Sequence, residues 1–218
     1  MNSTSKLLPA LLALVALAAG ILLSLNYNNK PDEIAQTQTT IPGLLWPNPK
    51  QITAFHLIDQ NSETFDLEKL KGHWSMIFFG YTHCPDVCPI TMTLLKSVVG
   101  ELSIHNEPLP QVIFVTVDPE RDTPQHLADY VAYFNPDFLG LSGSKENISA
   151  LTRQLGILAM KVPDKNATND TEYLMDHSAS ILLLDPEARL TGIFSAPHDS
   201  VDIKQRYLAI RHFIEQQK

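Results

Sequence analysis

Cys84 and Cys88 are the only cysteines in the 218-residue chain, and both lie in the short run from Gly80 to Pro89. A disulfide between them would close a loop of about five residues, for which chain entropy predicts only about 2 kcal/mol of stabilisation. A stabilising disulfide would be better placed across a long loop. We therefore interpret the pair as a site of chemistry, whether redox chemistry, metal binding or both.

His177 is the candidate third member of this site. Two thiolates and one imidazole suit Cu(I), a soft ion that three ligands satisfy, and the same set could hold zinc with a fourth, open position. His177 lies in the run 173–180, interpreted as a loop, which has to face the cysteines for this hypothesis to hold. The alternative is a histidine with a purely structural role.

Asp118 begins a charged run that continues to Pro124. We expect Asp118 to lie near the cysteines, where its carboxylate would position a ligand or accept a proton. The alternative for this run is structural: Asp122 or Thr123 caps the following helix, and the other charges are solvated.

Several other side chains carry donor atoms but are not predicted to be ligands. His83 adjoins Cys84, and the alternation of side chains at the end of a strand turns it away from the thiol. Met160 and Met175 offer soft sulfur atoms, although methionine more often fills a core. The remaining histidines lie in segments of surface type and are predicted to be solvated: His56, His73, His105, His126, His198 and His212.

Strand-like and helix-like patterns alternate from residue 52 onward. The predicted strands form two hairpins, 52–58 with 64–67 and 180–184 with 190–194, and two buried strands, 74–79 and 111–117. Four helices are predicted. One follows Pro89, two cover 123–134 and 144–155, and the last ends the chain and carries Ile203, Tyr207, Ile210 and Ile214. This order predicts a thioredoxin-like α/β sandwich with a central mixed β-sheet.

The cysteines fall where the first central strand passes into its helix. A helix N-terminus stabilises a thiolate and lowers the pKa of Cys84, and cysteines four residues apart lie on one side of the turn. Thioredoxin-type oxidoreductases instead have two residues between their cysteines and a cis-proline in the facing loop. No proline occurs between Pro163 and Pro186, and the predicted topology puts His177 opposite the thiols.

Three runs together resemble the Sco/SenC family, in the order that the family has them: Thr82–Pro89, Val117–Pro124 and Asp176–Ser178. The resemblance covers the chain from about Thr53 to the C-terminus, together with the N-terminal apolar segment. It implies a membrane-tethered copper protein of thioredoxin fold that helps to assemble the dinuclear copper centre of cytochrome c oxidase.

The ligand positions of the family match Cys84, Cys88 and His177. Family members bind Cu(I), and in several cases Cu(II), and some are thought to keep the copper-site cysteines of the oxidase reduced. The expected function is therefore that of a metallochaperone, not an enzyme, which delivers copper to the copper-centre subunit of cytochrome c oxidase. Further expected partners are other periplasmic copper chaperones or thiol reductants. The alternative is a periplasmic thiol–disulfide oxidoreductase with Cys84 and Cys88 as its redox-active pair.

The N-terminal segment 7–25 is an uncharged apolar run. At 1.5 Å per residue it would extend about 28 Å, close to the roughly 30 Å bilayer core, so we expect an uncleaved transmembrane helix. A cleaved signal peptide is the alternative. Lys6 precedes the span and no arginine occurs before Arg121, which favours a bacterial inner-membrane protein with residues 1–6 in the cytoplasm and its domain in the periplasm.

Residues 26–50 are polar and contain prolines. They are predicted to form a linker between the membrane anchor and a copper-binding domain over 51–218. The formal net charge of −8 argues against nucleic acid as a partner, because phosphate binding needs clustered lysine and arginine.

Overall fold

The computed structural model describes residues 17–24, 41–163 and 173–217. Residues 17–24 form a helix within the predicted membrane span 7–25. The rest of that span, residues 1–6 and most of the predicted linker lie outside the described residues. Ile41–Lys218 forms one compact unit, and Met1–Thr40 is a separate one.

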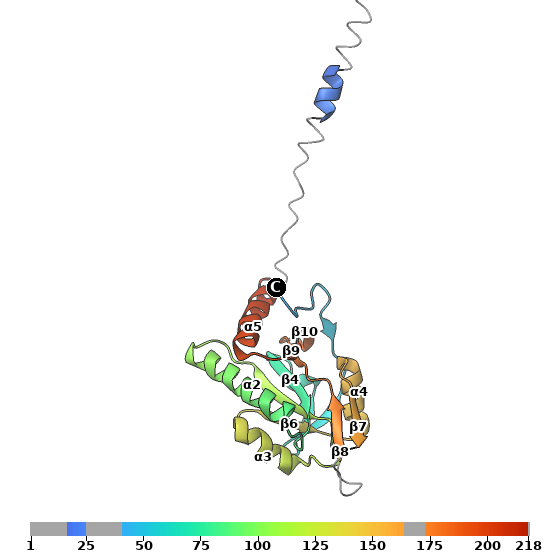
Figure 1. Ribbon diagram of the computed structural model, residues 1–218, viewed down its shortest axis with the longest axis vertical. Coiled ribbons are helices and arrows are strands. Elements are labelled where there is room, and N and C mark those ends of the chain that lie inside the picture. The colour runs from blue at the N-terminus through green and yellow to red at the C-terminus, as the bar shows by residue number, and fades with distance from the viewer. Residues whose placement is uncertain (1–16, 25–40, 164–172, 218) are drawn as a thin grey trace, which may run out of the picture. The chain divides into compact units, whose positions relative to one another are not determined.

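An eight-stranded mixed sheet forms the centre of the Ile41–Lys218 unit, in the order β1-β10-β9-β4-β5-β6-β2-β3 (Figure 1). The neighbours β4, β5 and β6 are parallel, and the other neighbouring strands are antiparallel. The strands of this sheet are β1 (Lys50–Gln51), β2 (His56–Asp59), β3 (Thr64–Asp66), β4 (Ser75–Gly80), β5 (Gln111–Thr116), β6 (Leu139–Ser142), β9 (Ile181–Leu184) and β10 (Arg189–Phe194). This is the mixed sheet of the predicted thioredoxin-like sandwich.

Helices cover both faces of the sheet. They are α2 (Val87–Ile104), α3 (Pro124–Phe134), α4 (Lys145–Leu155) and α5 (Ser200–Glu215), with a short 3₁₀ turn, η1, at Leu67–Lys69. Figure 1 shows α2, α3 and α5 on one face and α4 on the other. Thr123 caps α3 by accepting a hydrogen bond from the backbone N–H of His126, so of the two predicted capping residues Thr123 is the one that caps.

β4 is the central strand that leads into the cysteine motif. All six of its residues are buried, because β5 and β9 pair with its two edges and helices cover both faces. Phe78 and Phe79 point to opposite faces and are both fully buried. The unbroken apolar run at 74–79 is therefore typical of a strand buried on both sides, and the prediction of a buried strand there is confirmed.

α2 follows Cys84, contains Cys88 in its first turn and is a core helix. Among the described helices it is the one long and apolar enough to cross a membrane. Its buried residues include Met92, Leu95, Val98 and Leu102, which belong to the hydrophobic core of the unit. The helical period predicted after Pro89 is thus confirmed as the face that packs in the core.

The segment between α4 and β9 differs from the prediction. Strands β7 (Ala159–Pro163) and β8 (Tyr173–His177) pair as an antiparallel hairpin outside the main sheet, where the sequence predicted a loop before β9. Four of the five β7 residues are exposed, so no alternating pattern marks the strand. The short strand β6 was also not predicted; it contains Gly140, whose Cα lies so close to α3 that a Cβ would meet Leu127 at 3.0 Å.

Candidate metal centre

The cysteine turn, residues 80–88, links the end of β4 to the start of α2. The backbone N–H of Cys84 donates to the carbonyl of Tyr81 at 3.2 Å, which closes the turn. The N-cap residue of α2, Asp86, makes no side-chain capping bond. Instead the N–H of Cys88 donates to the sulfur of Cys84 at 3.5 Å. The Cys84 sulfur thus takes the place of a capping side chain at the positive end of the helix.

His177 is the last residue of β8 and lies opposite the cysteines. Its Nδ1 is 3.1 Å from the carbonyl oxygen of Ser178, and because a carbonyl only accepts, Nδ1 carries the proton. Its other ring nitrogen, Nε2, lies 3.5 Å from the sulfur of Cys88. The ring packs edge-on against Tyr81 and Phe78, at centroid separations of 6.0 and 6.1 Å. These contacts hold the imidazole with Nε2 toward the thiols.

Cys84, Cys88 and His177 form one cluster, which we call the thiol–imidazole site. Their ligand atoms all lie within 4.8 Å of one another. Both cysteines are free thiols, Cys84 half-buried and Cys88 buried. The topology predicted from sequence is confirmed, because residues 89 positions apart meet at the end of the central strand. Two soft sulfurs and one nitrogen at this spacing could bind Cu(I) with three ligands or zinc with an open position.

The two thiols differ in acidity. The pKa of Cys84 is lowered to about 3, chiefly because the Cys88 thiol hydrogen-bonds to its sulfur; burial opposes this, and His177 and backbone N–H groups add to it. The pKa of Cys88 is raised, because its proton is held in that bond and the thiol is buried. Near neutral pH the metal-free, reduced site therefore holds one thiolate and one thiol.

Gly80 and Tyr81 shape the site, although the sequence pattern did not single them out. A Cβ on Gly80 would lie 2.8 Å from the Cys88 sulfur and 2.7 Å from the Phe114 ring, so the sulfur needs a glycine there. Tyr81 is buried, and its pKa is raised by burial and then by the nearby cysteine sulfurs. The signal that could have identified both is their position between a buried strand and the cysteine motif.

A family model described as SCO1/SenC matches residues 47–212. The matched stretch contains the whole thiol–imidazole site and most of the Ile41–Lys218 unit. The chain belongs to the SCO1/SenC family. The resemblance that the three sequence runs carried is thereby confirmed.

Two curated relatives match this chain over most of their own length. A protein of Stutzerimonas stutzeri described as a putative copper-binding protein is 37% identical over 155 residues, which cover 71% of this chain and 74% of the relative. An SCO2-like protein of Rickettsia conorii is 39% identical over 152 residues, which cover 68% of this chain and 72% of the relative.

Solved SCO1/SenC structures share the fold. Arabidopsis thaliana ScoI with copper bound aligns with a TM-score of 0.69 and 31% identity, covering 73% of this chain and 97% of that one. Bradyrhizobium japonicum ScoI with copper bound aligns with a TM-score of 0.61 and 34% identity, covering 74% and 98%. The thioredoxin-like sandwich is thus common to this chain and to relatives that hold copper.

Asp118, which was predicted to position a ligand of the SCO1/SenC site, forms its hydrogen bonds with other residues. It accepts hydrogen bonds from the Tyr173 hydroxyl at 2.8 Å and from Nε of Arg121 at 2.5 Å, and within the described residues no hydrogen bond joins it to the thiol–imidazole site. The Arg121 guanidinium lies over the rings of Tyr173 and Tyr81, 3.6 and 5.7 Å from their centroids. Asp118 therefore reaches the site through Arg121 and Tyr81, and its role in positioning a ligand stays a prediction.

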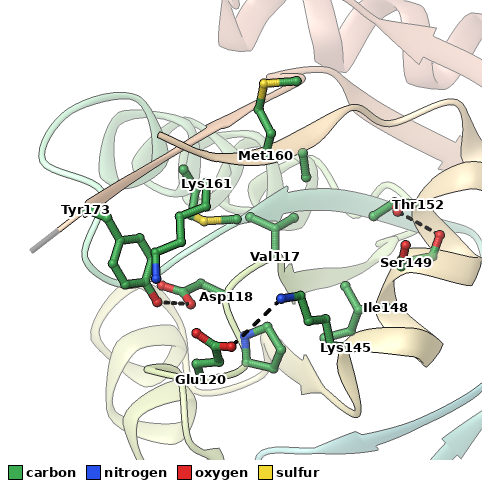
Figure 2. Close-up of a pocket in the computed structure, with 13 residues that line it drawn as sticks. Val117, Asp118, Glu120, Lys145, Ile148, Ser149, Thr152, Met160, Lys161 and Tyr173 are labelled. Atoms are coloured by element: carbon green, nitrogen blue, oxygen red, sulfur yellow. Dashed lines mark hydrogen bonds and ion pairs between the residues drawn. The ribbon is translucent and has the colours of Figure 1, made fainter. Parts of the chain in front are cut away.

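A cavity of about 280 Å³ lies beside Asp118. Residues from the segment that follows β5, from α4 and from both strands of the β7–β8 hairpin line it (Figure 2). Met160 and Met175 are among them, so the two methionines noted as soft donors border this cavity. At the edge of the cavity, the Nζ of Lys145 on α4 lies 3.9 Å from Oε1 of Glu120. A ligand role for either methionine stays a prediction.

His83 lies beside the SCO1/SenC cysteines without joining the cluster. Its side chain is about half exposed, and Nδ1 lies 3.1 Å from the Thr82 hydroxyl and 3.6 Å from Asp122. Five of the six histidines predicted to be solvated are exposed. The prediction was wrong for His198, which is half-buried and donates from Nε2 to the carbonyl of Ala179 at 2.7 Å. The loop after β10 folds back on the segment that follows β8, which the local sequence did not indicate.

Proposed function

We propose that this SCO1/SenC protein is a membrane-anchored copper metallochaperone. Cys84, Cys88 and His177 bind one Cu(I) ion, and the chain delivers it to the dinuclear copper site of cytochrome c oxidase during assembly. The approach of the three ligand atoms to within 4.8 Å carries the proposal. Relatives solved with copper bound support the metal, and the Sco/SenC resemblance supports the oxidase as the recipient.

The protonation of the site suits a Cu(I) ligand set. Cys84 is already a thiolate at neutral pH, since its pKa is lowered to about 3. Cys88 releases its proton when the ion binds, because a metal ion competes with a proton for the sulfur. His177 can offer Nε2 to the ion, because the hydrogen bond to the Ser178 carbonyl occupies Nδ1. Binding of Cu(I) to both sulfurs thus releases the proton of Cys88.

Transfer then proceeds by exchange of ligands. Cys84 is only half-buried, so a thiolate of the recipient can approach the ion from that side. Each new bond from a recipient thiolate replaces a bond to His177 or to a cysteine, and copper stays Cu(I) throughout. Oxidation of the two cysteines to a disulfide would remove two electrons and both thiolates, and with them the copper site.

A second function, thiol–disulfide exchange, is favoured by the unequal acidity of the cysteines. The Cys84 thiolate would attack a disulfide in the copper site of the oxidase and release one thiolate. Cys88 would then lose its proton and attack the mixed disulfide, which leaves a Cys84–Cys88 disulfide and reduced oxidase cysteines. Two electrons pass to the oxidase in this reaction, and an external dithiol has to reduce the chain again.

Cu(I) binding by the full-length chain, purified without oxygen, tests the copper function. We expect one Cu(I) per wild-type chain and loss of tight binding in Cys84→Ser, Cys88→Ser and His177→Ala. His56→Ala is the matched control, because His56 is exposed on β2, and it should bind like the wild type. Undiminished binding in His177→Ala would exclude the three-ligand site. Disulfide exchange that survives in His177→Ala while copper binding is lost would assign the thiol–disulfide function.

We further propose that segment 7–25 anchors the chain in the inner membrane of a bacterium, with the Ile41–Lys218 unit in the periplasm. The apolar side chains of the helix at 17–24 support this: Leu17, Ile21, Leu22 and Leu23 are all exposed. Carbonate-washed membranes should retain the chain, and protease added to spheroplasts should digest its domain. A domain protected from the protease would contradict this orientation, and a shortened, soluble mature chain would indicate a cleaved signal peptide.

A further inference from the structure

Asp122 carries a fully buried carboxylate beside the cysteine turn. Its Oδ2 accepts hydrogen bonds from the backbone N–H of Thr82 at 3.0 Å and from the Thr116 hydroxyl at 2.6 Å. Its Oδ1 accepts from the Thr82 hydroxyl at 2.6 Å. Three donors from two separate segments therefore converge on one buried charge.

These hydrogen bonds join the cysteine turn to the sheet. Thr82 precedes Cys84 by two residues, and Thr116 ends β5 next to the end of β4. The Thr116 hydroxyl also accepts from the N–H of Asp118 at 2.9 Å, so its own hydrogen is directed to Asp122. The Asp122 carboxylate thus bridges the turn and the neighbouring strand.

The Asp122 carboxylate is not needed to begin α3, because Thr123 caps that helix. A buried charge costs free energy unless hydrogen bonds and partners compensate it. The Asp122 backbone is held too: its N–H donates to the carbonyl of Asp118 at 3.0 Å, and its carbonyl accepts from the Ser142 hydroxyl at 3.4 Å. Asp122 is therefore a fixed point to which the cysteine turn is tied.

We propose that Asp122 is a positioning residue for the thiol–imidazole site. Its carboxylate fixes Thr82 through both backbone and side chain, and so determines where Cys84 presents its sulfur to a soft metal ion. The inference rests on the proposed copper function and adds to it the residue that orders the ligands. Outer groups that orient metal ligands change metal affinity by about 10- to 100-fold when they are removed.

The Asp122 carboxylate also brings a negative charge close to the cysteine turn. This charge favours a cation in the site, because the ion then offsets the charge of the carboxylate.

Two substitutions separate the shape of Asp122 from its charge. Asp122→Ala removes all three acceptor contacts, whereas Asp122→Asn keeps the shape and an acceptor for the Thr82 N–H. Asp185→Ala is the matched control. Asp185 is equally buried and accepts from two backbone N–H groups and from Arg189 in the β9–β10 turn. That turn lies at the opposite end of β4 from the cysteines.

We expect Asp122→Ala to weaken Cu(I) binding by the full-length chain about 10- to 100-fold, measured by competition with a chromogenic Cu(I) chelator. Amide hydrogen exchange at Thr82 should become at least about tenfold faster in the reduced, copper-free chain, because the turn opens more easily. Asp185→Ala should lower the unfolding midpoint but should change neither the Cu(I) affinity nor the exchange rate at Thr82. The copper affinity and the Thr82 exchange rate of Asp122→Asn should lie closer to those of the wild type than to those of Asp122→Ala.

A folded Asp122→Ala variant with wild-type copper affinity and wild-type exchange at Thr82 would overturn the proposal. An equal loss of copper affinity in Asp185→Ala would also overturn it. If Asp122→Ala does not fold, Thr82→Val and Thr116→Val decide: Thr82→Val should weaken copper binding more, and an equal or reversed order refutes the proposal. A wild-type chain that binds no Cu(I) would refute the proposed function instead, and exchange at Thr82 would still test Asp122.

Discussion

The two halves of the thiol–imidazole site are built differently. The cysteine turn follows β4, which is buried along its whole length at the centre of the eight-stranded sheet, and Asp122 ties the turn to β5. His177 instead ends β8, which pairs with β7 in a separate two-stranded sheet, and β7 is largely exposed. The two cysteines are thus attached to the core of the unit, whereas the histidine belongs to a peripheral hairpin.

For the proposed copper transfer, this difference predicts which ligand leaves first. Segments with many buried contacts open at a higher free-energy cost than exposed segments with few. We therefore expect Cys84 and Cys88 to keep their spacing while His177 releases the ion to an incoming thiolate. The bond from the Tyr173 hydroxyl to Asp118 fixes the hairpin near its other end.

The largest expected effect concerns how the alkylation rate of Cys84 depends on pH. Because the pKa of Cys84 is lowered to about 3, its thiolate persists as pH falls from 8 to 5. Alkylation by iodoacetamide in the reduced, metal-free chain should therefore be nearly flat over this range. An ordinary thiol with a pKa of about 8.5 reacts roughly several hundred-fold faster at pH 8 than at pH 5.

Two variants show which half of the site creates this thiolate. The bond from Cys88 is the main cause of the lowered pKa, and His177 contributes less. The profile should therefore stay flat in His177→Ala and rise with pH in Cys88→Ala. A wild-type rate that climbs about tenfold per pH unit would contradict the lowered pKa. A steep profile in His177→Ala alone would assign control of the thiolate to the hairpin.

Gly80→Ala tests the rigidity of the cysteine half. The added Cβ would lie 2.7 Å from Phe114 and 2.8 Å from the Cys88 sulfur, and a buried strand cannot easily move to relieve this. We expect a loss of about 1–3 kcal/mol in the free energy of unfolding, measured with denaturant, together with weaker Cu(I) binding.

Gly100→Ala is the control for Gly80→Ala. Gly100 lies on the exposed side of α2 with nothing within 4 Å of an added Cβ, so alanine should stabilise the chain by about 0.5–1 kcal/mol. Equal changes in the free energy of unfolding at the two glycines would show that the end of β4 accommodates an added methyl group as easily as the surface of α2 does.

Tyr173→Phe tests the attachment of the hairpin half. The Tyr173 hydroxyl donates to Asp118 inside the protein, and burial together with this bond raises the pKa of Tyr173 to about 12. Its removal should cost about 1 kcal/mol in the free energy of unfolding and speed amide exchange along β8. Tyr133→Phe, at a side chain that is 81% exposed, should change stability by less than about 0.5 kcal/mol. Identical results for the two tyrosines would refute the role given to this bond.

Local patterns predicted much of the fold because they depend on neighbouring residues. The apolar run at 74–79 indicated a strand buried on both faces, and the period after Pro89 indicated a core helix. The β9–β10 hairpin was predicted from its two apolar runs on either side of a turn. The β7–β8 hairpin was not, because exposed strands that pair mainly with each other leave no alternating pattern.

The sequence by itself determined the chemistry of this protein: two cysteines four residues apart, a histidine before a strand, and an order of elements that had to bring them together. Only the tertiary structure decided how they are held. Thr82 meets Asp122 across 40 positions, and Tyr173 meets Asp118 across 55. Such polar contacts depend on which strand ends become neighbours in the sheet. They leave no periodic trace in the sequence, because a hydrogen bond joins single atoms and not the faces of helices or strands.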